Sequence, residues 1–185
     1  MNCINCKTKS CKIEYKDCNL NKENVLAEYS NKEIHGLYKT ADNLVSNGKA
    51  GELSRIEELI EFINENNYNL VSIAYCFSME NQVKFLSDIF KENNIKTTSI
   101  RCTINGIKEN EILSNNKENV NCNPIGQAKA INNSSADFVI EMGLCLGHDV
   151  LFHKYIKKPF TVLAVKDRVY NNCPLKYFVK ENLKK

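Results

Sequence analysis

The chain has 185 residues, of which 43% are hydrophobic and 25% charged, so it is long enough to form a core and too apolar for a disordered protein. The net charge of +3 comes from Lys residues scattered among Glu and Asn, which argues against a nucleic-acid partner. The sequence has neither an apolar run of about 18 residues nor a signal-peptide core, so we expect a cytoplasmic protein with no membrane partner.

Cysteine is the unusual component of this sequence, because nine of its residues are Cys. Disulfides rarely persist in a reducing cytosol, where many thiols more often indicate metal or redox chemistry. A single free Cys also packs well as a small buried apolar residue, so each thiol alone has that simpler explanation. The positions of the cysteines along the predicted elements must therefore decide between metal ligands and buried structural thiols.

The first segment holds four cysteines and almost no apolar periodicity. Cys3 and Cys6 form a C-x2-C pair, a common way to place two thiolates on one metal, and Cys11 and Cys18 complete a set of four. We call these four residues the N-terminal cysteines. Because metal binding supplies folding free energy, it would order a segment that lacks a core. We predict a metal-binding segment over 1–24, with unligated or redox-active thiols as the alternative.

An α/β domain is predicted over 25–185, beginning with a pair of helices. Apolar residues at helical spacing predict the first helix over 34–45, which Asn47-Gly48 would end. The second follows Ser54, which forms a capping box with Glu57.

Strands and helices then alternate along the chain. Strands are predicted over 70–75, 97–100, 137–142 and 161–165, and helices over 81–93, 124–131, 149–155 and 175–183. A Lys, Asn and Glu-rich loop is expected from Asn105-Gly106 to Asn121. This order predicts an α/β fold with a mostly parallel, doubly wound sheet of about four strands.

Four further cysteines fall at the carboxyl ends of predicted strands or before a helix. Cys76, Cys102 and Cys145 each follow a strand, and Cys122 leads into the helix that begins at Pro124. Carboxyl ends of parallel strands share one edge of a sheet, where ligands bind, and a helix N-terminus favours the thiolate form. We call these four the rim cysteines. They are predicted ligands of an iron–sulfur cluster or of zinc, whereas four buried structural thiols are the alternative.

Two short stretches near the rim cysteines add candidate site residues. Gly143 and Gly147 flank a turn whose backbone N–H groups could approach an anion or a cluster sulfide. The candidates for proton transfer or substrate binding are His148, Asp149, Lys166 and Arg168, with a solvated His, a capping Asp and surface cations as the simpler interpretations. The long polar side chains of Arg55, Gln127 and Lys129 are expected on solvated helix faces.

A family resemblance rests on the segments 74–76, 101–102, 122–128, 143–149 and 166–169, above all Cys-Asn-Pro-Ile from Cys122 and Gly-Leu-Cys-Leu-Gly-His-Asp from Gly143. The chain resembles uncharacterised cysteine-rich bacterial and archaeal proteins classed as a domain of unknown function. The resemblance implies a presumed metal-binding role and no particular reaction. It differs from that family near the end of the chain, where the family pattern has His before Asn-Pro and this chain has Asn171-Asn172-Cys173-Pro174.

Three functions fit these observations. The first is an enzyme in which three rim cysteines hold a metal or cluster and leave one coordination position for a small-molecule substrate. The second is a non-catalytic structural or redox-sensing module with closed sites. The third, nucleophilic catalysis by Cys145 with His148, is less favoured because other thiols converge on the same edge. No feature of the sequence requires an oligomer.

Overall fold

The computed structural model describes residues 2–46 and 49–182, so the predicted helix stop at Asn47-Gly48 and the residue Leu183 lie outside the described part. The chain divides into two compact units, Met1–Glu52 and Leu53–Lys185. Each is described by itself. The metal-binding segment predicted over 1–24 was defined by its cysteine ligands, so its limit at residue 24 stays a prediction.

The first unit consists of short helices: η1 (Cys3–Asn5), α1 (Ser10–Ile13), α2 (Lys22–Glu28) and α3 (Lys32–Asn43). α3 begins after Asn31, whose side-chain oxygen accepts hydrogen bonds from the N–H groups of Glu33 and Ile34 at 2.9 and 3.3 Å. This helix confirms the one predicted over 34–45. No residue from 2 to 39 is buried, in agreement with a segment that has no core of its own.

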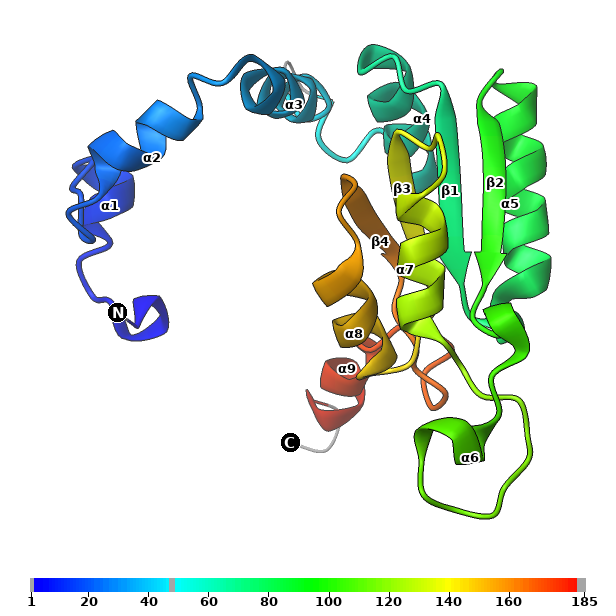
Figure 1. Cartoon of the computed structure of the whole chain (residues 1–185). Coiled ribbons are helices and arrows are strands. Elements are labelled where there is room, and N and C mark those ends of the chain that lie inside the picture. The colour runs from blue at the N-terminus through cyan, green and yellow to red at the C-terminus, as the bar shows by residue number, and fades with distance from the viewer. Residues whose placement is uncertain (1, 47–48, 183–185) are drawn as a thin grey trace. The chain divides into compact units, whose positions relative to one another are not determined.

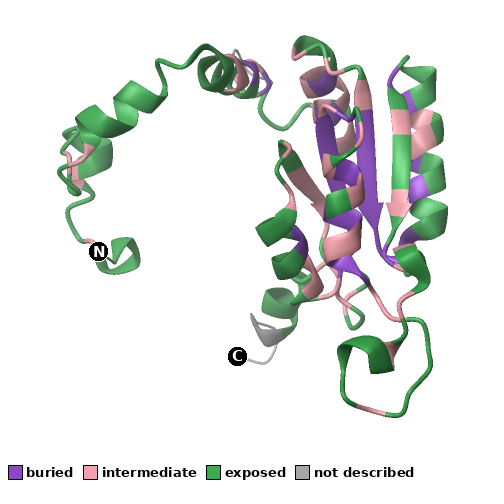
Figure 2. Cartoon of the chain, in the orientation of Figure 1, coloured by how far each residue is buried: buried purple, intermediate pink, exposed green. Residues whose placement is uncertain are grey.

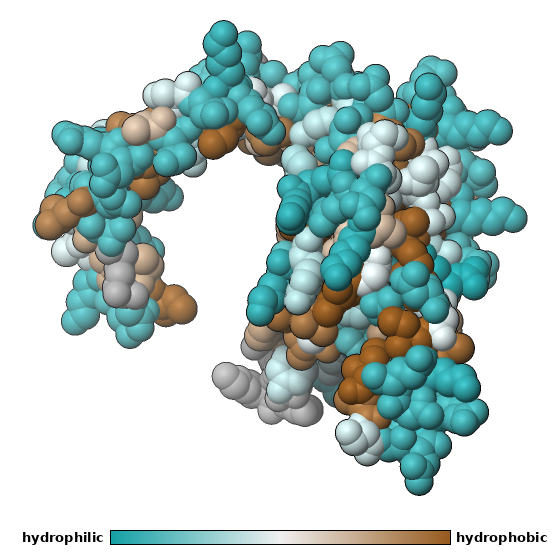
Figure 3. All heavy atoms as spheres, in the orientation of Figure 1, coloured by the Kyte–Doolittle hydropathy of each residue, from teal (hydrophilic) through white to brown (hydrophobic). Residues whose placement is uncertain are grey.

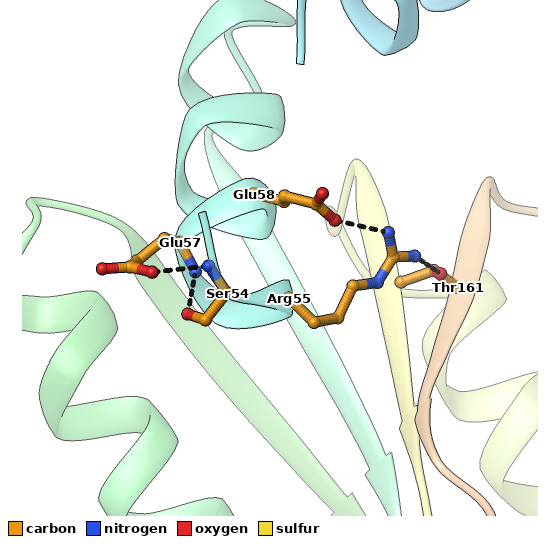
Figure 4. Close-up of polar contacts among 5 residues, drawn as sticks. All are labelled: Ser54, Arg55, Glu57, Glu58 and Thr161. Carbon is orange, nitrogen blue, oxygen red and sulfur yellow. Dashed lines mark hydrogen bonds and ion pairs between the residues drawn. The ribbon is translucent and has the colours of Figure 1, made fainter. Parts of the chain in front are cut away.

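The second unit begins with α4 (Arg55–Glu65), and its capping box is the predicted one (Figure 4). Ser54 Oγ accepts the N–H of Glu57 at 3.4 Å, and the Glu57 carboxylate accepts the N–H of Ser54 at 2.6 Å. Arg55 lies on the surface and donates to Glu58 at 3.2 Å and to Thr161 at 2.9 Å. Arg55 thus ties α4 to a strand that is distant in sequence.

Within the described residues, the sheet has four parallel strands in the order β2-β1-β3-β4. Their bounds are β1 (Leu70–Tyr75), β2 (Lys96–Arg101), β3 (Phe138–Met142) and β4 (Phe160–Ala164). The pairing is in register along β1, where Tyr75 lies between Arg101 of β2 and Met142 of β3. The carboxyl ends therefore meet at one edge, and the predicted α/β fold is confirmed.

Helices cover both faces of this sheet, as a doubly wound fold requires (Figure 1). α4 and α5 (Glu80–Glu92) lie on one face, and α7 (Pro124–Asn132) and α8 (His148–Tyr155) on the other. The chain reverses its direction across the sheet between β1 and β3, the type of switch point at which ligands bind. The remaining elements are η2 (Phe77–Met79), η3 (Ile104–Gly106), α6 (Glu109–Ile112) and α9 (Lys176–Asn182).

η3 and α6 lie in the segment predicted as a loop. There the backbone of Lys108 pairs with that of Val120 in an isolated antiparallel bridge, which closes the segment on itself. None of the helices in the described ranges is long and apolar enough to span a bilayer.

The core lies around the two central strands, as the buried residues in Figure 2 show. β3 is buried along its whole length and β1 from Val71 onward. On one face, Phe138 of β3 packs against Phe62 of α4 with ring centroids 5.6 Å apart. The two strands that lead to Cys76 and Cys145 are therefore part of the buried core.

Glu141 is a charged exception in this core, because it lies in β3 and is 2% exposed. Its carboxylate forms a short hydrogen bond with Nε2 of His153 in α8. Burial raises the pKa of Glu141 above its ordinary value of 4.5, and the hydrogen bond and charge of His153 oppose that rise. His153 therefore makes it possible to bury this carboxylate.

Replacing His153 with Ala is expected to destabilise the fold increasingly as the pH rises. Without His153, the pKa of Glu141 rises further in the folded state, while the unfolded value stays near 4.5. Stability then falls as the pH rises above 4.5, by about 1–3 kcal/mol at neutral pH. Urea unfolding over a pH series measures this loss. The double variant Glu141→Gln/His153→Ala should lose the pH dependence, and an equal dependence in both variants would refute the argument.

Candidate metal centre

Backbone hydrogen bonds extend the strand ladder beyond the carboxyl ends and bring three of the rim cysteines together. The N–H of Cys76 donates to Met142 O at 3.1 Å, and the N–H of Cys102 donates to Tyr75 O at 2.9 Å. The N–H of Asn123 then donates to Cys102 O at 2.6 Å, which places Cys122 against Cys102.

The thiols of Cys76, Cys102 and Cys122 contact one another in series. A hydrogen bond joins Cys122 Sγ and Cys102 Sγ, 3.6 Å apart, and the thiols of Cys102 and Cys76 are close enough to shift each other's pKa. Cys102 Sγ also accepts the N–H of Phe77 at 3.4 Å, and Cys76 Sγ lies 3.4 Å from Ser78 Oγ. Three thiols from three chain segments thus form one cluster.

Cys145, the fourth rim cysteine, is held differently. Its Sγ accepts a hydrogen bond from Nη2 of Arg168 at 3.2 Å. All nine cysteines are free thiols, and within residues 2–46 and 49–182 no three His, Cys, Asp or Glu side chains are already arranged around one metal position. A metal ion would therefore have to draw these thiols into a coordination set.

The three clustered thiols differ in acidity. The hydrogen bond with Cys102 lowers the pKa of Cys122, and the positive charge of Arg168 acts in the same direction. The pKa of Cys102 is raised, chiefly by its bond with Cys122. Its bond with Cys102, together with burial, raises the pKa of Cys76 to about 12. Cys122 is thus the first of the three to become a thiolate, and a metal must displace a proton from Cys76.

Lys166 approaches the cluster from the segment after β4. Its ammonium group donates a short hydrogen bond to Ser78 Oγ, the atom that also contacts Cys76. The charge of Lys166 opposes the rise in the pKa of Cys76. Two cations, Lys166 and Arg168, therefore flank thiols that would carry negative charge on a metal.

The backbone N–H groups of both glycines in the turn after β3 are already hydrogen-bonded within the protein. The N–H of Gly143 donates to Ala164 O at 2.7 Å, and the N–H of Gly147 donates to the Asp149 carboxylate at 2.8 Å. That carboxylate also accepts the N–H of Val150 at 2.7 Å, so Asp149 pairs two backbone N–H groups at the start of α8. A bound anion would have to compete with these bonds. His148 is half-buried at the start of α8.

Gln127 is a residue that the sequence analysis placed wrongly. It was expected on a solvated helix face, whereas it is fully buried beneath the cluster. Its amide nitrogen donates to Tyr75 O at 3.1 Å and to Ile100 O at 2.8 Å, at the ends of β1 and β2. Gln127 thus holds α7, and with it Cys122, against both strands. Arg55 and Lys129 are exposed, as expected.

Replacing Gly126 with Ala is expected to disturb the start of α7. A methyl group there would lie 2.2 Å from the amide nitrogen of Asn123, whose side chain caps the helix by accepting the N–H of Gly126 at 2.8 Å. Loss of this cap should lower stability by about 1–2 kcal/mol in urea unfolding. The matched variant Gly36→Ala, where nothing lies within 4 Å, should not lower it; equal effects would contradict the clash.

The N-terminal cysteines all line one cavity of about 750 Å³ in the first unit. Cys6 Sγ accepts the N–H of Lys9 at 3.4 Å and lies 3.7 Å from Thr8 Oγ1, and these bonds lower the pKa of Cys6. The cavity is also lined by four cations that would balance thiolate charge: Lys9, Lys12, Lys16 and Lys22.

The fold and site define a class: a parallel α/β protein with thiols gathered at the carboxyl edge of its sheet. Residues 11–163 match the model of a family described as protein of unknown function (DUF1847), and the chain belongs to this family. The uncharacterized protein MJ0455 of Methanocaldococcus jannaschii is 33% identical over 193 residues, covering 99% of this chain and 98% of that protein. No solved structure matches the chain. The resemblance to an uncharacterised family is thereby confirmed.

Proposed function

We propose that this protein binds a metal ion or an iron–sulfur cluster through Cys76, Cys102 and Cys122. The observation that carries the proposal is the contact of these three thiols at the carboxyl edge, with Cys102 Sγ and Cys122 Sγ 3.6 Å apart. Three segments far apart in sequence supply them. A position at a switch point, beside two cations, favours ligands over thiols that only fill space in the core.

The sulfur–sulfur distance supports two thiolates on one metal. Tetrahedral zinc with bonds of about 2.3 Å places its sulfur ligands about 3.8 Å apart. The 3.6 Å separation of Cys102 and Cys122 needs little change to reach that value. Two cysteines on one iron of a two-iron cluster fit equally well, whereas ligands of different irons would have to separate.

The role of Cys145 favours a centre with one open position. Its thiol is engaged by Arg168, so three thiols are free to act as ligands while the fourth position is left to a small molecule. Catalytic zinc sites commonly have three protein ligands and one exchangeable position, at which the metal acts as a Lewis acid. A closed, non-catalytic centre would require Cys145 to leave Arg168 and become the fourth ligand.

A second, structural metal at the N-terminal cysteines is part of the proposal. The four thiols share one cavity, and none of the described residues 2–24 is buried and could order the segment. Metal binding would supply that order. Reduced thiols in both sets suit a cytoplasmic protein.

Alkylation of metal-free and zinc-loaded protein with iodoacetamide, read by mass spectrometry, tests the rim centre. Metal binding should protect Cys122, while Cys173, also half-buried but outside both sets, should react at the same rate in both samples. Ferrous iron with sulfide replaces zinc in a parallel experiment. Equal alkylation of Cys122 with and without either metal would refute the proposal.

A further inference from the structure

A small pocket lies directly beside Cys122. It encloses about 280 Å³ between the α6 segment, the start of α7 and the first turn of α8. Figure 3 shows apolar surface between the polar α6 segment and the helices above it. Five apolar side chains line the pocket: Ile112, Leu113, Pro124, Ile125 and Leu151.

The polar side chains of this pocket are few, and two of them have a donor group with no hydrogen-bond partner in the described part of the chain. Asn123 uses its amide in capping α7 and in bonds to Ile104 O and Asn105. Asn121 accepts the N–H of Cys122 through its oxygen at 2.8 Å, and no bond from its amide nitrogen occurs in the described part of the chain. The ring nitrogens of His148 likewise make no hydrogen bond in the described part of the chain. Asn121 and His148 therefore offer hydrogen-bond donors to a ligand.

We infer that this pocket binds a small carboxylate with an aliphatic body. The apolar walls favour a ligand with an aliphatic body, and the volume is below that of pockets for drug-sized ligands. A carboxylate has acceptor oxygens for both donors, whereas an ammonium group would leave them unpaired. The carboxylate end lies at Asn121 and His148, which supply the two donors.

This assignment rests on the proposed function in one respect, namely that the bound carboxylate is the substrate of the rim centre. A carboxylate oxygen is an ordinary ligand of zinc or iron, so a molecule held beside Cys122 can reach an open coordination position. Binding in the pocket itself depends only on the lining residues, and it can be measured without a metal.

Titration with sodium hexanoate, followed through methyl NMR signals of Ile125 and Leu151, tests the assignment in metal-free and zinc-loaded protein. Hexanoate should shift both signals, and 1-hexanol and hexylamine should bind about tenfold more weakly because they lack the charged acceptor. Leu151→Asp, followed through Ile125, places a like charge in the pocket and should weaken hexanoate binding at least about tenfold. Val150→Asp is the matched control on the same helix, since Val150 is 60% exposed and does not line the pocket.

The outcomes separate this inference from the proposed function. Absence of hexanoate binding, equal binding of 1-hexanol, or unchanged binding in Leu151→Asp would overturn the carboxylate pocket even if zinc protects Cys122. Hexanoate binding that is lost in Leu151→Asp and kept in Val150→Asp would support the pocket. If, in addition, no metal protects Cys122, only the metal centre would be refuted.

Discussion

Cys102→Ser is expected to weaken metal binding at the rim by roughly 100-fold or more while leaving the N-terminal centre intact. Cys102 is the middle thiol of the cluster, because its Sγ is hydrogen-bonded to Cys122 and it also raises the pKa of Cys76. Binding free energies of about 10–16 kcal/mol shared among three or four ligands give about 3 kcal/mol for each, so affinity should fall roughly 100-fold or more. Competition with a chromogenic chelator measures the change.

Two matched variants make this prediction specific. Cys173→Ser should leave both centres unchanged, because Cys173 belongs to neither set. Cys6→Ser should remove only the N-terminal metal, since Cys6 lies in a different unit from the rim cysteines. Loss of both metals from either the Cys102 or the Cys6 variant would contradict two independent centres.

Gly143→Ala is expected to be strongly destabilising. Gly143 has φ of +66°, a left-handed conformation that costs other residues about 1–2 kcal/mol. An added methyl group would also lie 2.8 Å from Cγ of Met79, a buried side chain whose sulfur contacts Asn172 at 3.3 Å. Overpacking of this kind adds about 1–3 kcal/mol, so the total is roughly 2–5 kcal/mol, a large share of a typical domain's stability.

Gly106→Ala is the control for Gly143→Ala. Gly106 has a similar φ of +58°, but nothing lies within 4 Å of the added methyl group. The Gly106→Ala variant should lose only the stability that the left-handed conformation costs, about 1 kcal/mol. Urea unfolding of both variants measures the difference, and equal losses would show that the contact with Met79 has no energetic role.

The sequence predicted the fold well because its strands are short, apolar and bounded by polar turns. The strand over 70–75 matches β1, and the bounds of the other three strands agree within one residue. Parallel pairing then required the cysteines after β1 and β2 to be neighbours. The proximity of Cys76 and Cys102 therefore followed from topology alone.

Other features depend on tertiary contacts that no local pattern encodes. Gln127 has a long polar side chain that is typical of a surface position. Its burial is explained only by its hydrogen bonds to the carbonyls of Tyr75 and Ile100 at the strand ends. Glu141 looks out of place in a buried strand until His153 provides a partner from α8. The bond from Arg168 to Cys145 joins segments without any shared periodicity. Long-range polar pairs of this kind are visible only in the folded chain.

Metal and acid-labile sulfide analysis of protein purified without oxygen tests the central claim most directly. The account predicts bound zinc, or iron with sulfide, in the wild-type protein, with the rim share lost from Cys102→Ser and retained in Cys173→Ser. Iron with sulfide would identify a cluster, and zinc alone a mononuclear centre. Wild-type protein that holds no metal, and takes up none from zinc or from iron and sulfide, would contradict the account.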